Sequence, residues 1–166
     1  MSIKQALMVL TTLAVLCCLG VRAESQLARR GTYSVHYWWQ ASGKWYAIEK
    51  DHTFWVGESS GTIFNDSGEG FLHRASAVCP GVRDVFKEFV NAHGYCVITD
   101  EDDDKAMLAW RCKGEGRCVG DAEWMGGTGK YTGLKGHHTV YGVVRSGNLD
   151  GSSGCAVFKG EWQLPD

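Results

Sequence analysis

The feature that most constrains the fold is a run of alternating residues near the start of the chain. In TYSVHYWWQ, Tyr33, Val35, Tyr37 and Trp39 occupy every second position, and a more mixed set of side chains lies between them. Successive side chains of a β-strand point to opposite faces, so this spacing predicts a strand with one apolar face. The C-terminal run CAVFKGEWQLP alternates in the same way and is expected to be the closing strand.

Further runs rich in aromatic and β-branched residues lie between these two. They are HTFWVGESSGTIFN, GYCVITD, KAMLAWRC, VGDAEW and HTVYGVV, and Gly, Asn, Asp and Ser separate them. Glycine is frequent, with 22 residues, whereas only 2 prolines occur. Short strands at regular spacing with such turn residues are typical of an all-β, antiparallel domain, here with seven to nine strands in a barrel or a sandwich.

One segment departs from the strand pattern. In VRDVFKEFVNAHG the apolar residues are spaced i, i+3, i+4, i+7 and i+8, which is the pattern of an amphipathic helix. Pro80 and Gly81 precede the segment, and Gly94 stands where a helix C-cap would end it. The sequence therefore predicts one short helix, from Val82 to Asn91.

The N-terminus predicts export from the cytoplasm. Lys4 precedes the apolar run ALMVLTTLAVLCCLGV, and Val21 to Ala23 offer a small-x-small cleavage site. We expect residues 1–23 to be a signal peptide and residues 24–166 to form one secreted or periplasmic domain, with no later segment apolar enough to span a membrane. The chain has 17 Lys and Arg against 19 Asp and Glu and no basic run, which argues against a nucleic-acid partner.

Five of the seven cysteines follow the expected cleavage site, in a compartment that favours disulfides. Cys112 and Cys118 flank the glycine-containing loop KGEGR, and strands leaving such a hairpin can bring them opposite each other. Cys79 and Cys96 bracket a compact segment and form the second expected bridge. Cys155 then remains outside the two bridges, although other pairings of five cysteines stay open.

Two short motifs resemble catalytic or nucleotide-binding loops but lack their context. GTGK, with Lys130, has neither the glycine that a phosphate-binding loop needs five positions before Gly129 nor a Ser or Thr after the lysine. GESSG contains Ser59 at the position of a nucleophile, but the β-branched run TIFN follows it instead of a helix. We therefore expect neither a nucleotide site nor a serine nucleophile.

The acidic run Asp100–Asp104 resembles half of a calcium loop. It lacks the glycine and the distal glutamate of an EF-hand and lies between two predicted strands. Aspartate tolerates the left-handed conformation of tight turns, so a hairpin tip is the preferred interpretation, with opportunistic calcium binding as the alternative. The histidines are scattered without the short spacings of zinc sites, and neither a metal nor a cofactor is predicted.

Several segments resemble one family of proteins. FWVGESSGTIFND, GFLHRASAVCPGV, GYCVITDEDDDKAMLAWRC, EWMGGTGKYTGLKG and FKGEWQLP are similar to small secreted bacterial proteins of unassigned activity, related in fold to the allene oxide cyclase barrel and calycin-like. The resemblance covers nearly all of the chain after residue 23 and implies a closed or nearly closed antiparallel barrel of about eight strands. It carries no catalytic residue across. In such a barrel the glycines at 126, 127, 129, 133 and 136 are expected at corners.

The leading functional hypothesis is a small barrel that binds an apolar or amphipathic ligand in its mouth, because eight-stranded barrels can hold one small ligand. The expected ligand-binding residues are Tyr37, Trp39, Phe54, Trp110, Phe158 and Trp162. The alternative to an open mouth is a barrel that its own aromatic side chains fill.

Two rival functions belong to other classes. One is a cyclase or isomerase that uses Glu49, Glu58 or Glu123 as a buried carboxylate; the other is an envelope interaction protein that uses an outer face carrying Trp38.

Overall fold

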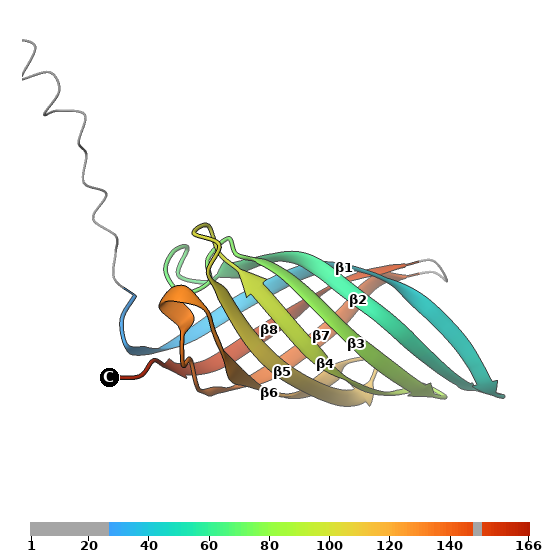
Figure 1. The fold of residues 1–166 in the computed structure, drawn as a ribbon. Helices are drawn as coiled ribbons and strands as arrows, with labels where there is room; N and C mark the ends of the chain where they lie inside the picture. The colour runs from blue at the N-terminus through green and yellow to red at the C-terminus, as the bar shows by residue number, and fades with distance from the viewer. Residues whose placement is uncertain (1–26, 148–150) are drawn as a thin grey trace, which may run out of the picture.

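The computed structural model describes residues 27–147 and 151–166, so the expected signal peptide lies outside the described residues. Eight strands form a closed antiparallel barrel in sequence order (Figure 1). They are β1 Arg30–Glu49, β2 His52–Asn65, β3 Ser76–Phe86, β4 Phe89–Thr99, β5 Lys105–Glu115, β6 Cys118–Gly127, β7 His137–Gly147 and β8 Ser152–Gln163. The prediction of an all-β, antiparallel barrel of about eight strands is confirmed.

Pairing of the first and last strands closes the barrel. The antiparallel ladder between β1 and β8 runs from Arg30 opposite Gln163 to Ala41 opposite Ser152. Each strand is thereby bonded to two neighbours, and only residues 42–49 of β1 extend beyond this ladder and pair with β2 alone. The alternation seen at residues 33–39 and in the C-terminal run belongs to these two strands, whose apolar residues face the interior together.

The helix predicted from Val82 to Asn91 is wrong. The segment is the hairpin between β3 and β4, in which Val85 pairs with Val90 and Phe86 with Phe89. Lys87 makes the turn with a φ of 57°. Apolar pairs placed symmetrically about a two-residue turn reproduce the helical spacing by coincidence. Both halves of the segment are strands because β3 also pairs with β2 and β4 also pairs with β5. The one helical element among the described residues is the 3₁₀ turn η1, Gly129–Tyr131.

The two ends of the barrel differ. The turns β1–β2, β3–β4 and β5–β6 lie at one end, and the longer loops, including η1, lie at the other together with the C-terminus (Figure 1). We call these the turn end and the loop end.

Aromatic side chains fill the loop end. Phe71, from the loop between β2 and β3, stacks on Trp162 with ring centroids 4.7 Å apart and an interplanar angle of 3°. The Phe71 ring is also surrounded by Tyr33, Trp124 and Tyr131, at centroid distances of 5.1, 5.7 and 5.9 Å. All five residues are buried, so Phe71 acts as a plug that joins the loop to the strands.

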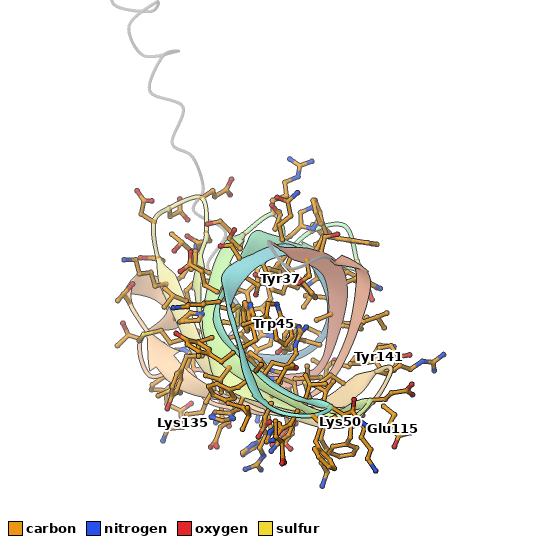
Figure 2. All side chains as sticks on the ribbon, turned by 90° about the vertical axis from the view of Figure 1, so that its right-hand side faces the viewer. Tyr37, Trp45, Lys50, Glu115, Lys135 and Tyr141 are labelled. Carbon is orange, nitrogen blue, oxygen red and sulfur yellow. A yellow bond between two sulfur atoms is a disulfide. The ribbon has the colours of Figure 1, made fainter. Side chains whose placement is uncertain are left out.

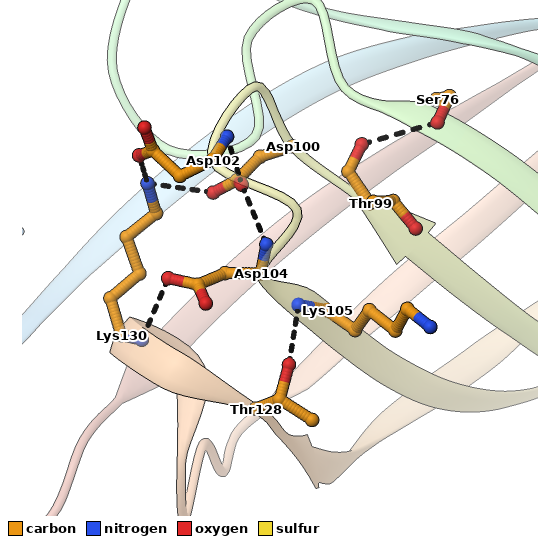
Figure 3. A network of polar contacts seen from close by, with 8 residues as sticks. All are labelled: Ser76, Thr99, Asp100, Asp102, Asp104, Lys105, Thr128 and Lys130. Carbon is orange, nitrogen blue, oxygen red and sulfur yellow. Dashed lines mark hydrogen bonds and ion pairs between the residues drawn. The ribbon is translucent and has the colours of Figure 1, made fainter.

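The acidic run and the GTGK motif bind each other at the loop end (Figure 3). Asp100 accepts hydrogen bonds from the backbone N–H of Asp102 and Asp104, and Asp103 has a φ of 63°, as expected for a hairpin tip. The Lys130 ammonium lies 2.8 Å from Asp100 Oδ2 and also pairs with Asp102. Although burial opposes ionisation of Asp100, hydrogen bonds from Lys130 and Tyr131 lower its pKa overall. Lys130 therefore forms ion pairs with two of the five acidic side chains of this run.

The two expected disulfides are present. Cys79 in β3 is bonded to Cys96 in β4, and Cys112 in β5 is bonded to Cys118 in β6. Cys155 is buried in β8 and takes part in neither bridge. Each bridge joins the two strands of its own hairpin, β3–β4 or β5–β6, and so reinforces a pairing that the sheet already makes.

We predict that Trp162→Ala lowers the free energy of unfolding by about 3–5 kcal/mol, because a buried indole is lost and a cavity remains beside Phe71. Trp38→Ala is the matched control: Trp38 is 52% exposed on the outer face, and its loss should cost less than about 1 kcal/mol. Urea unfolding followed by circular dichroism measures both. A cost below about 1.5 kcal/mol for Trp162→Ala would mean that the loop end is not the structural core.

Candidate functional site

A cavity of about 390 Å³ occupies the other half of the barrel. Its lining reaches from Tyr37 to residues at the turn end, such as Glu88 and Arg117, and most of its wall is apolar. Figure 2 looks into the barrel from this end, and Tyr37 and Trp45 appear inside the ring of strands. The cavity therefore opens where the strand turns are, and the aromatic core of the loop end forms its floor.

Tryptophans that lie flat against glycines make the wall. A Cβ on Gly81 would stand 2.9 Å from Trp110 Cζ2, and one on Gly94 would stand 3.0 Å from the same atom. Trp55 covers Gly43 and Gly57 in the same manner on the neighbouring strands. Because these glycines have no side chain, the indole rings lie along the wall and the space between them stays open.

Tyr37 supplies a polar atom near the floor. Its hydroxyl lies 3.3 Å from Ser59 Oγ and 3.5 Å from the Ala77 carbonyl oxygen. Burial, partly offset by the Ser59 hydrogen bond and reinforced by the charge of Glu58, raises the pKa of Tyr37 to about 12. The phenol is therefore protonated at neutral pH and can donate a hydrogen bond to a ligand.

Three ionisable side chains besides Tyr37 line the cavity, namely Arg83, Glu88 and Arg117. Arg83, in β3, stands over the ring of Trp55 at 5.7 Å. Arg117, in the turn between β5 and β6, stands over the Tyr141 ring at 5.8 Å. Burial lowers the pKa of Arg83, yet an arginine keeps its charge at any physiological pH.

Four of the six residues expected to bind a ligand line this cavity: Tyr37, Trp39, Trp110 and Phe158. Trp162 lies in the filled loop end instead. Phe54 pairs with Tyr46, which is 43% exposed, so its position belongs to the outer face.

The sequence analysis named Phe54, but the neighbouring Trp55 is the residue that lines the cavity. A shift of one residue moves every side chain of a strand to the other face, and the sequence FWVG does not settle which of two adjacent aromatic residues points inward. The signal that could have found Trp55 is its spacing from the glycines: Gly57 and Gly61 are both an even number of positions away, on the inner face.

The carboxylates considered for catalysis lie outside the cavity. Glu49, Glu58 and Glu123 are all exposed and none lines it. Ser59 does line it, but in the continuous strand β2 and not in the turn before a helix that a nucleophile elbow requires. Among residues 27–147 and 151–166, no group of three or more His, Cys, Asp or Glu could hold a metal ion. Within the same ranges no helix is long and apolar enough to cross a membrane.

A polar side chain, that of His138, is buried beyond the floor of the cavity. His138 is 4% exposed and lies among the rings of Tyr33, Trp124 and Phe158, with centroid distances of 5.7, 5.1 and 5.5 Å. Neither of its ring nitrogens has a hydrogen-bond partner among the described residues. Burial and the neighbouring His137 lower the pKa of His138 to about 4, so the ring is neutral at pH 7.

The fold and its cavity define the chain as a closed eight-stranded antiparallel barrel, filled at one end and hollow at the other. Among solved structures it is similar to the pterocarpan synthase dirigent protein GePTS1, with 12% sequence identity, a TM-score of 0.49, and coverage of 85% of this chain and 89% of that one. No family model matches the chain, and no curated protein sequence matches it. The relation to allene oxide cyclase and the bacterial origin implied by the sequence resemblance stay predictions.

We predict that His138 makes the fold sensitive to acid. Its folded pKa of about 4 lies below the unfolded value of 6.5, so its contribution to stability is complete above about pH 6.5 and is lost as the pH falls toward 4. The loss is on the order of 3 kcal/mol. Chemical unfolding of the wild type and of His138→Leu between pH 4 and 8 measures this loss. It appears as a difference between the two proteins in the slope of unfolding free energy against pH.

His93→Leu is the matched control, because the His93 side chain is exposed on β4 and lies outside the ring cluster around His138. This variant should keep the slope of the wild type. Equal slopes for the wild type and His138→Leu would contradict the prediction, whatever their stabilities at pH 7.

Proposed function

We propose that this protein binds one small apolar or amphipathic molecule inside the turn end of the barrel. The single observation that carries the proposal is the cavity of about 390 Å³. Pockets for small molecules usually measure about 300–1,000 Å³ and combine apolar walls with a few polar groups. Here Trp39, Trp55 and Trp110 supply flat apolar surface, and the Tyr37 hydroxyl supplies a polar contact near the floor.

The filled end supports a binding role because its packing offsets the folding free energy that the open cavity forgoes. An open interior forgoes the packing that normally stabilises a small barrel. The aromatic cluster around Phe71, the polar contacts of Lys130 and the disulfides supply stability elsewhere. The hollow half can then stay open for a ligand without loss of the fold.

We also propose that the protein works in an oxidising compartment, secreted or periplasmic. The two disulfides agree with this location, since cytosolic proteins seldom keep structural disulfides. The expected signal peptide at residues 1–23 points the same way.

We predict that Ala92→Phe blocks ligand binding. Ala92 is 3% exposed and lines the cavity, so a benzyl side chain there occupies the space that a guest would fill. Titration with the apolar probe N-phenyl-1-naphthylamine should give a micromolar dissociation constant for the wild type and an affinity at least about tenfold lower for the variant.

Ala109→Phe is the matched control, since Ala109 pairs with the exposed Tyr95 and Glu123 on the outer face and receives the same added atoms. It should bind the probe like the wild type. Absence of probe binding by the wild type, or equal binding by both variants, would exclude the cavity as the binding site.

A further inference from the structure

Arg83 is the one charged side chain of the cavity wall that comes from the middle of a strand rather than from a turn. It pairs with Trp55 in β2 and Ala92 in β4, both of which line the cavity, so its side chain projects from the inner face. β3 ends at Phe86, three residues further on, which sets Arg83 just inside the mouth.

The guanidinium of Arg83 has no anionic partner within the described part of the chain. No carboxylate there lies within 4.0 Å of it, and no hydrogen bond from it is found in residues 27–147 and 151–166. Its one described contact is with the Trp55 ring, over which it stands at 5.7 Å. A ring face holds a guanidinium in place but leaves its five N–H donors available.

An arginine in such a position is costly unless something pairs with it. Removing a charge from water into a partly buried apolar site is unfavourable, and the lowered pKa of Arg83 has the same cause. By contrast, a carboxylate can accept two parallel hydrogen bonds from a guanidinium, a stronger contact than a neutral acceptor provides. The ring faces of Trp39, Trp55 and Trp110 carry no charge and suit an apolar body.

We propose that the ligand is an amphipathic anion, whose carboxylate or similar head binds Arg83 just inside the mouth while its apolar part lies deeper, against the tryptophans. This inference rests on the proposed binding function and adds to it the charge and the orientation of the ligand. Arg117 at the turn end adds a second positive charge to the rim, opposed by Glu88, so the lining favours one anionic group and disfavours a cation.

Three ligands with unbranched alkyl chains of nearly equal length and different heads test the inference: decanoate, decanol and decyltrimethylammonium, each displacing N-phenyl-1-naphthylamine at pH 7.5. The wild type should bind decanoate at least about tenfold more tightly than decanol, and the cationic ligand most weakly. Arg83→Met keeps the apolar stem over Trp55 and removes the charge. It should weaken decanoate at least about tenfold and leave decanol within about twofold.

Two further variants separate charge from packing. Arg83→Lys keeps the charge and should retain part of the preference for decanoate. Arg111→Met is the matched control, because Arg111 is exposed on β5 and pairs with Asp121 at 2.9 Å, away from the cavity; it should bind all three ligands like the wild type.

Equal affinity of the wild type for decanoate and decanol would overturn the inference while leaving the proposed function intact, and so would an equal loss of both ligands in Arg83→Met. If the wild type binds neither the probe nor any of the three ligands, the proposed function itself fails, and the inference fails with it.

Discussion

Closure of the sheet by the β1–β8 ladder is the constraint on which the rest of the molecule depends. The ladder joins residues 30–41 to residues 152–163, the two ends of the described chain. This pairing separates an inner face of the sheet from an outer one. Both the aromatic core of the loop end and the cavity of the turn end exist because this ladder closes the sheet into a barrel.

The two halves of the barrel interior differ along its axis: one is packed and the other is open. At the loop end, chain segments outside the strands bring Phe71 and Tyr131 inward, and the rings pack against Trp124 and Trp162. At the turn end the connections are too short to cover the opening, since two residues separate β1 from β2, β3 from β4, and β5 from β6. Loop length thus decides which half is solid and which half is accessible.

Sequence reasoning succeeded where a pattern reports a local property. Period-two alternation correctly predicted the strands, and the short glycine-containing loop between Cys112 and Cys118 correctly predicted their disulfide. It failed where the outcome depends on pairing across the sheet. The helical spacing around Lys87 could not show that β2 and β5 would bond to both sides of that hairpin, and the sequence could not tell whether Phe54 or Trp55 faces inward. Arg83 escaped notice because its position on the cavity wall exists only once the barrel has closed.

The fit of tryptophans onto glycines decides which single substitutions can change the size of the cavity. A side chain on Gly81 or Gly94 meets both Trp110 and the backbone oxygen of an adjacent strand, at 2.8 Å from His93 and 2.3 Å from Pro80. Single steps that narrow the pocket from the glycine side are therefore blocked. Truncating Trp110 needs no rearrangement of the backbone and leaves a wider pocket. The pocket can therefore be widened by one substitution at a tryptophan, whereas narrowing it at Gly81 or Gly94 requires the adjacent strand to shift as well.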